Sequence, residues 1–223
     1  MTKWLKETDY YRRVLMDQSE YKIHVEERVY NTGLIDLLKG QTHVCGIFLL
    51  EGDIHYYDQT YRRYSLLWID QGTNLIVNVD HSFKILFMET EMPLKEGALH
   101  LQVFDDDALS WSRPLEEGVT ASKHMVKPED YGVKIQTCIY THNFVHEWHT
   151  HTAAHGFYVL EGMLEYDFEG EGVSYYGPGE FVASKPGDEI MHVQAPDASY
   201  CKYLFIGDGP FDFIVNGVNL YGQ

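Results

Sequence analysis

Histidines cluster directly before an apolar stretch in the second half of the chain. His149, His151 and His155 fall within seven residues, and an apolar run at 156–160 follows. Side chains two residues apart in a strand point to the same side, so His149 and His151 can face one interior, and His155 returns to it after a short break. Imidazole nitrogens bind Zn, Fe, Mn, Ni and Cu ions. The pattern therefore predicts a metal site.

A histidine-rich surface is the alternative interpretation, because five of the twelve histidines lie between residues 142 and 155. A surface tract, however, would not lead straight into Phe-Tyr-Val-Leu. His142 and His146 lie just upstream and could support the metal ligands without binding the ion. Three acidic residues flank the motif, and none is assigned as a catalytic acid or base: Glu147, Glu161 and Glu165.

Composition limits the classes of partner and the cellular setting. The chain has 223 residues and a formal net charge of −17, which argues against nucleic acid or an anionic membrane as a partner because phosphates would be repelled. The three cysteines, Cys45, Cys138 and Cys201, form no disulfide framework or CxxC motif. The N-terminus lacks the apolar region of a signal peptide, and no apolar run is long enough to span a membrane. We therefore expect a cytoplasmic protein.

Short apolar runs that alternate with Gly-, Asn- and Asp-containing turns occupy most of the sequence. This pattern predicts an all-β sandwich or barrel and not βαβ units. Residues 1–20 have loose helical spacing and predict a short N-terminal helix or arm, whereas the polar, turn-rich residues 106–130 predict a linker. The predicted strands are 21–25, 44–50, 54–57, 64–69, 75–79, 83–88, 133–140, 156–160, 164–168, 173–176, 181–184 and 200–206.

The two halves of the chain resemble each other. Residues 46–57 read GIFLLEGDIHYY and residues 156–167 read GFYVLEGMLEYD, at an offset of 110. This repeat predicts two copies of one β domain. At the same offset, the positions of His149, His151 and His155 correspond to Lys39, Gln41 and Cys45 in the first copy. A metal site is therefore expected in the second copy alone.

The second half resembles the cupin superfamily. In the first cupin motif, H-x-H is followed after three or four residues by a Glu, and after six more by a Gly. His149-x-His151, His155 and Gly162 have this spacing, although His155 stands where the family has Glu. The second motif, a Gly followed by a Pro-containing turn and then a His, resembles residues 179–192, with a slightly longer distance from Gly to His.

This resemblance implies two jelly-roll barrels in tandem, a bicupin. It divides the chain into an N-terminal helix or arm at 1–20, a degenerate cupin at 21–105, a linker at 106–130 and a metal-binding cupin at 131–223. The implied ligands are His149, His151, His155 and His192. The pocket for a small-molecule substrate is expected to be lined by Phe157, Val159, Tyr203 and Phe205. By the same resemblance, we expect a homodimer.

Two closer resemblances imply different reactions. The second half is similar to the Mn-binding half of ureidoglycine aminohydrolase, although that family has Glu at the position of His149 and Gln at that of His192. The all-histidine set resembles the cupin iron dioxygenases that cleave diketones or hydroxyacetophenones. The expected function is therefore a metal-dependent enzyme, with an iron(II) dioxygenase favoured over a hydrolase or isomerase. A ligand-binding bicupin without activity is the alternative outside the enzyme class.

The ligand types also bear on the metal and the substrate. Neutral imidazoles leave the full charge on a divalent ion, which favours an anionic, chelating substrate such as an enolate. An all-nitrogen set favours Fe, Ni, Cu or Zn over Mn, with Fe(II) preferred. Arg113 is the last arginine of the chain, so we expect no arginine clamp for a carboxylate inside the second barrel and favour an apolar or aromatic substrate.

Overall fold

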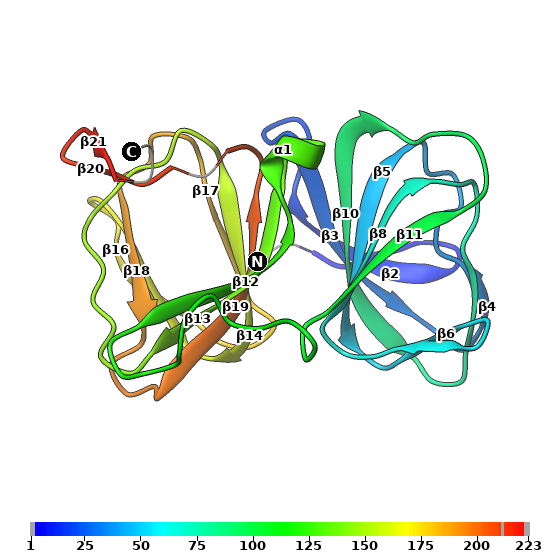
Figure 1. The fold of residues 1–223 in the computed structure, drawn as a ribbon, viewed down its shortest axis with the longest axis horizontal. Coiled ribbons are helices and arrows are strands. Elements are labelled where there is room, and N and C mark those ends of the chain that lie inside the picture. Colours follow the sequence, from blue (N-terminus) through cyan, green and yellow to red (C-terminus); the bar gives the residue numbers. More distant parts are fainter. Residues whose placement is uncertain (1–2, 211, 221–223) are drawn as a thin grey trace. The chain divides into compact units, whose positions relative to one another are not determined.

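The computed structural model describes residues 3–210 and 212–220, so residues 1–2 of the expected N-terminal arm and residues 211 and 221–223 of the expected second cupin lie outside the described part. The chain forms two compact units, residues 1–109 and 110–223. Figure 1 shows each unit as its own group of strands, the first coloured blue to green and the second green to red. The all-β fold predicted from the sequence is confirmed.

The first unit is built from two antiparallel sheets. Its larger sheet has the strand order β1-β2-β3-β10-β5-β8-β11, and its smaller sheet the order β4-β9-β6-β7. An apolar core that includes Ile47, Leu67 and Phe87 fills the unit. The strands are β1 (Leu5–Lys6), β2 (Tyr10–Met16), β3 (Ile23–Tyr30), β4 (Gly33–Asp36), β5 (His43–Glu51), β6 (Ile54–Tyr56), β7 (Gln59–Tyr61), β8 (Ser65–Gln71), β9 (Ile76–Val79), β10 (Phe83–Pro93) and β11 (His100–Asp105).

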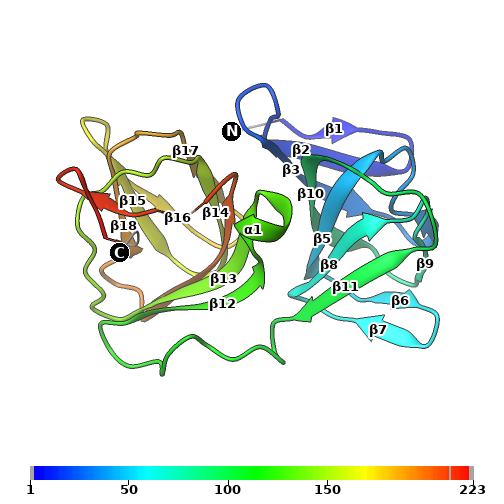
Figure 2. The same ribbon diagram turned by 45° about the horizontal axis from the view of Figure 1, so that its top comes forward.

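The second unit repeats this architecture with a five-stranded and a three-stranded sheet. Their orders are β12-β13-β19-β14-β17 and β16-β15-β18, and Figure 2 shows both groups of strands. A hairpin, β20-β21, and one short helix complete the unit. The elements are β12 (Thr120–Val126), α1 (Pro128–Tyr131), β13 (Lys134–Thr141), β14 (His155–Gly162), β15 (Leu164–Phe168), β16 (Gly172–Tyr176), β17 (Phe181–Ser184), β18 (Ile190–Gln194), β19 (Tyr200–Gly207), β20 (Ile214–Val215) and β21 (Val218–Asn219).

The core of the second unit lies between its two sheets. Phe157 and Phe205 come from the five-stranded sheet, and Tyr166 and Ile190 come from the three-stranded sheet. All four side chains are buried, because the alternation of side chains along each strand points every second residue inward. Polar side chains on the inward-pointing faces of these two sheets would therefore lie close to one another and could form a binding site.

Of the predicted N-terminal helix or arm, the helix is wrong. Residues of this segment form β1 and β2, and β2 pairs antiparallel with β3 so that Tyr10 is opposite Tyr30. The rings of these two tyrosines stack at 4.9 Å, and Arg12 forms an ion pair with Glu26 at 3.0 Å. Pairing with the edge of the sheet provides hydrogen-bond partners for the backbone and brings these side chains together. The free energy gained in this way outweighs a weak local preference for a helix.

The predicted linker at 106–130 is also too long. Its residues 120–126 form β12, and residues 128–131 form α1. Strand β12 pairs antiparallel with β13, which places Ser122 opposite Cys138 and His124 opposite Gln136. Ala121, Lys123 and Met125 are buried on the opposite face of the strand. Part of the predicted linker is therefore a strand of the five-stranded sheet of the second unit.

Candidate metal centre

Five imidazoles meet between the two sheets of the second unit. His155 is the first residue of β14, and His192 lies in the middle of β18. His146, His149 and His151 belong to the segment between β13 and β14. The structure thus brings together the four histidines predicted as ligands and adds His146. His149, His151, His155 and His192 are each no more than 5% exposed.

Backbone hydrogen bonds fix the segment that carries three of these histidines. His149 N donates to Ile190 O at 3.0 Å, and Ile190 N donates to His149 O at 2.9 Å, so His149 lies beside β18. Gly187 N donates to His151 O at 2.9 Å. Gly187 has φ 84°, a left-handed conformation that glycine adopts without a steric penalty. The Pro186-Gly187 turn of the second motif therefore supports the first motif.

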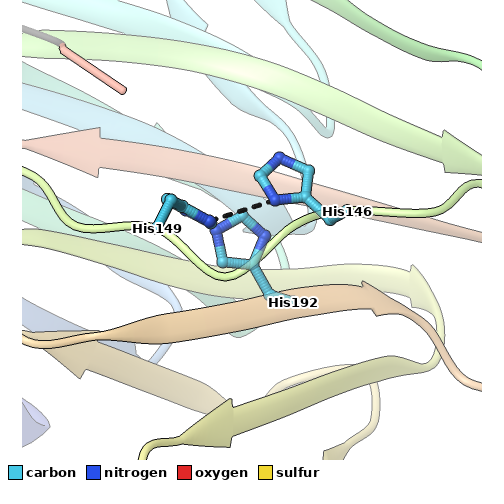
Figure 3. Close-up of side chains that lie close together, drawn as sticks. All are labelled: His146, His149 and His192. Carbon is cyan, nitrogen blue, oxygen red and sulfur yellow. Dashed lines mark hydrogen bonds between the residues drawn. The ribbon is translucent and has the colours of Figure 1, made fainter. Parts of the chain in front are cut away.

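The imidazoles form two overlapping triads. One consists of His146, His149 and His192, and the other of His151, His155 and His192. Within each triad, the candidate ligand nitrogens lie within 4.8 Å of one another, and each triad could hold a metal ion. Figure 3 shows the first triad, in which His146 Nδ1 and His149 Nδ1 are 3.1 Å apart. His192 is common to both triads.

Oxygen acceptors face the Nδ1 atoms of three of these rings. His149 Nδ1 is 2.8 Å from Glu147 O, and His192 Nδ1 is 2.6 Å from Tyr140 Oη. His151 Nδ1 hydrogen-bonds to Asp212 O. An acceptor at Nδ1 favours the tautomer with the proton on that atom, which leaves the lone pair on Nε2 for a metal. His155 is oriented by Ser184, whose Oγ is 3.0 Å from Nε2 and 3.2 Å from Nδ1.

Burial keeps the imidazoles neutral at pH 7. Desolvation lowers the pKa of His146 to about 4 and that of His149 to about 3. Desolvation also lowers the pKa of His155 and His192 well below the ordinary histidine value, and that of His151 in the same direction. A metal ligand must be unprotonated. These rings are therefore already in the form that binds a divalent ion.

Two buried nitrogens test whether a metal fits this set. Nε2 of His149 and Nε2 of His192 have no hydrogen-bond partner among the described residues. A buried polar atom without a partner costs about 1–3 kcal/mol, so such atoms are rare unless they have a function. Both Nε2 atoms belong to rings whose Nδ1 faces an oxygen. This arrangement fits a divalent transition metal and leaves its identity open.

A cavity of about 270 Å³ lies beside the imidazoles. Three of the four predicted pocket residues line it, namely Phe157, Tyr203 and Phe205. Val159 does not line the cavity, because its fully buried side chain packs in the core of the second unit. His146, His149, His151 and His192 also line the cavity, so a molecule inside it reaches the candidate metal centre.

Arg113 is the main surprise in this cavity. The sequence predicts no arginine clamp for a carboxylate inside the second barrel, but the exposed Arg113 side chain lines the cavity together with Lys134. The prediction was wrong because residues 106–130 were assigned to a linker, and a linker would not reach the barrel interior. Strand β12 brings the preceding residues to the cavity wall. The signal in the sequence that could have revealed this strand is the apolar residues Ala121 and Met125, which lie an even number of positions apart and are each followed or preceded by a polar neighbour.

The first unit differs at the corresponding positions. Lys39 is exposed and Gln41 half-buried, whereas Cys45 is fully buried in the core. Burial raises the pKa of the Cys45 thiol to about 12, which disfavours the thiolate that a metal would need. Among the described residues, the groups of three or more side chains that could hold a metal lie in the second unit.

Comparison with known proteins adds information about the fold. No family model matches the sequence, and no curated protein matches it. Among solved structures, the Cupin 2 conserved barrel domain protein from Leptotrichia buccalis is similar with a TM-score of 0.67 and 15% identity, over 91% of this chain and 90% of that chain.

No helix of the described residues has the length and apolar character needed to cross a membrane.

Two further structures show the same likeness over most of both chains. Oxalate decarboxylase from Lactobacillus farciminis, in a formate complex, has a TM-score of 0.64 and 8% identity, over 94% of this chain and 84% of that chain. Protein Ylba from E. coli has a TM-score of 0.68 and 13% identity, over 92% and 86% of the two chains. Identities this low establish the fold alone. Over more than nine tenths of its length, this chain therefore has the tandem-barrel fold of the bicupins.

Proposed function

We propose that the second unit is the centre of a metal-dependent enzyme that acts on a small, chelating organic substrate. The proposal assigns the metal to His149, His151, His155 and His192, with His146 beside them. The observation that supports it most is the pair of buried, unpartnered Nε2 atoms on His149 and His192, whose rings are held by acceptors at Nδ1.

Among the reactions open to such a site, we place iron(II)-dependent dioxygenation first. Neutral nitrogen ligands suit iron(II), and a bound divalent ion there would supply a Lewis acid and a place for oxygen. The chain itself contributes a cavity with aromatic walls. Phe157, Tyr203 and Phe205 exclude water from one side of a substrate, and desolvation raises the pKa of Tyr203 well above its ordinary value, so that its hydroxyl keeps its proton.

A redox-neutral hydrolysis or isomerisation is the second candidate, and His146 is the observation that favours it. His146 lines the cavity, is half-buried and lies next to the other imidazoles. Its pKa is lowered by burial to about 4, so at pH 7 it is neutral and one of its ring nitrogens can accept a hydrogen bond. The imidazole would orient a water molecule or a substrate hydroxyl in such a reaction.

Elemental analysis of protein purified without added metal or chelator is the first test. The double variant His149→Ala/His151→Ala should lose the metal, whereas His142→Ala, which removes an exposed imidazole outside both triads, should keep it. About one equivalent of iron, with oxygen uptake on diketones or hydroxylated aromatics, would support the dioxygenase. Zinc, nickel or manganese without oxygen uptake would support the second candidate. Protein without metal would contradict the proposal and leave a ligand-binding bicupin.

A further inference from the structure

The cavity beside the imidazoles has two chemically different walls. One is formed by imidazoles and aromatic rings. The other is formed by side chains of β12 and β13 and by the residues just before β12, including Arg113, Ser122, Lys134 and Gln136. The cavity has a volume of about 270 Å³, just below the ~300–1,000 Å³ of typical ligand pockets, so it suits a small organic molecule.

The charge of the lining is opposite to that of the chain. The sequence holds 34 acidic and 17 basic residues, yet no Asp or Glu is among the described residues that line the cavity. Arg113 and Lys134 supply two cationic side chains, and the other polar lining groups are neutral. Arg113 is exposed and Lys134 half-buried, and two cations in a cavity without carboxylates create a positive potential that attracts an anion.

Two hydrogen bonds attach Ser112, the residue before Arg113, to strand β12. Ser112 N donates to Ser122 O at 2.8 Å, and Ser122 N donates to Ser112 Oγ at 3.1 Å. Next to them, Lys123 Nζ lies 4.6 Å from the centre of the Trp111 ring. The backbone on the N-terminal side of Arg113 is therefore fastened to β12. The guanidinium of Arg113 can form two parallel hydrogen bonds with a carboxylate. Because the main chain is already held in place, binding costs little additional conformational entropy.

The sheet register places Lys134 on the same row as His155. Lys134 is opposite Gly207 in β19, and Gly207 is opposite His155 in β14. Gly207 has no side chain, and a Cβ there would lie 3.0 Å from the Phe205 ring and 3.6 Å from Lys134 Cβ. The Phe205 ring thus occupies the space beside Gly207, and it stacks on the His155 ring at 5.5 Å. Lys134 Nζ lies 5.9 Å from the centre of the same Phe205 ring, so the amine and the His155 imidazole contact one aromatic side chain.

Gln136 adds a polar group to this wall. Its side chain is only 7% exposed and lines the cavity between Lys134 and Cys138. Its Nε2 donates to Cys138 Sγ at 3.1 Å, whereas its Oε1 is buried without a hydrogen-bond partner among the described residues. A ligand in the cavity can satisfy this oxygen with a hydroxyl or N–H group.

We propose that the substrate is a small organic anion, whose carboxylate is bound by Arg113 and Lys134 while its other end reaches the imidazole cluster. This inference rests on the proposed function, because it names the substrate class of the same site. Arg113 and Lys134 are then specificity-determining residues. The lining of one cavity thus combines cationic side chains for the carboxylate with imidazoles for the rest of the substrate.

Benzoate and benzamide test this proposal, since they differ little in shape and differ in charge. Their dissociation constants are measured by calorimetry on protein whose metal content has been determined. Benzoate should bind at least about tenfold more tightly than benzamide. Arg113→Gln and Lys134→Gln should each weaken benzoate about tenfold or more, because a charge-assisted hydrogen bond is lost, and should leave benzamide unchanged. Arg62→Gln, an exposed arginine of the first unit, is the matched control and should change neither constant.

The metal content separates the two proposals. Variants that keep the metal but bind both probes equally well would overturn the anion site and leave the metal enzyme standing. Wild-type protein that holds no metal, yet binds benzoate through Arg113, would contradict the proposed function and retain an anion site. Arg113→Lys, which keeps the charge and loses the planar fork, should recover part of the benzoate affinity. Full loss of affinity and of metal in this variant would indicate a structural role for Arg113 and overturn the proposal.

Discussion

The hydroxyl oxygen of Tyr140 lies 2.6 Å from Nδ1 of His192, and both side chains are buried. Desolvation raises the pKa of Tyr140 well above its ordinary value, so this hydroxyl stays neutral. A neutral tyrosine oxygen can accept a hydrogen bond from Nδ1–H of His192. The contact therefore orients the one imidazole that both triads share.

Replacement of Tyr140 by Phe should weaken metal binding without removing a ligand. Loss of a hydrogen bond that orients a metal-binding histidine commonly costs about 10–100-fold in affinity. We expect a loss in this range, measured by competition with a chelator of known affinity. Tyr175→Phe, at an exposed tyrosine on β16, is the control and should leave the affinity unchanged. Equal affinities in all three proteins would show that Tyr140 does not orient His192.

The two triads predict an order among the histidine variants. His192 belongs to both triads, whereas His146 and His155 belong to one each. His192→Ala should therefore lose most of the bound metal, and His146→Ala and His155→Ala should lose less. Metal content by elemental analysis measures the order, and circular dichroism checks that each variant is folded. A His192→Ala protein with full metal content would exclude both triads as the metal site.

Gly162 should tolerate alanine much less well than Gly170. Both glycines have positive φ, 75° and 81°, so alanine at either position costs about 1–2 kcal/mol in backbone strain. A Cβ at Gly162 would in addition collide with the carbonyl oxygen of Tyr200, whereas a Cβ at Gly170 meets nothing within 4 Å. We expect Gly162→Ala to destabilise by roughly 3 kcal/mol or more in urea unfolding. Similar losses in the two variants would contradict this steric explanation.

The first unit should lose stability in acid through Glu26. Burial alone would raise the pKa of this carboxyl, but hydrogen bonds from His24, Arg12 and Arg28 lower it to about 2, against 4.5 for an ordinary Glu. The unfolded chain therefore binds the proton more readily, and the stabilisation is present above pH 4.5 and lost as the pH falls toward 2. The difference corresponds to about 3 kcal/mol.

Urea unfolding of wild type and Glu26→Gln between pH 2 and pH 7 measures this contribution. The variant should be less stable at pH 7, and its stability should depend less on pH below 4.5, because its side chain cannot ionise. Glu96→Gln, at an exposed carboxylate, is the control and should follow the wild type. Parallel pH curves for Glu26→Gln and the wild type would contradict the assigned pKa.

The sequence predicted well what depends on local pattern. Alternating apolar residues and glycine turns indicated the strands, and the repeat at residues 46 and 156 indicated two similar domains. His149 and His151 could be paired because their spacing matches the two-residue period of a strand. His192 is 37 residues away from His155 in the sequence, and only the resemblance to a known motif connected the two.

What the sequence did not predict depends on pairing between distant segments. Strand β2 is a strand because β3 lies beside it, and no pattern within residues 10–16 is strong enough to show this. Arg113 lines the cavity because Ser112 is hydrogen-bonded to Ser122 ten residues later. His146 joins the imidazoles through the path of a segment without regular structure, which a periodicity argument cannot trace.

The two walls of the cavity are encoded in different stretches of the gene. Arg113 and Lys134 fall within residues 110–140, whereas the five imidazoles fall within residues 146–192. Substitutions in the first stretch can change which molecule is selected and leave the metal ligands in place. Evolution, or a designer who varies Arg113 and Lys134 and keeps Tyr140 for its contact with His192, can therefore vary substrate choice and metal chemistry one at a time.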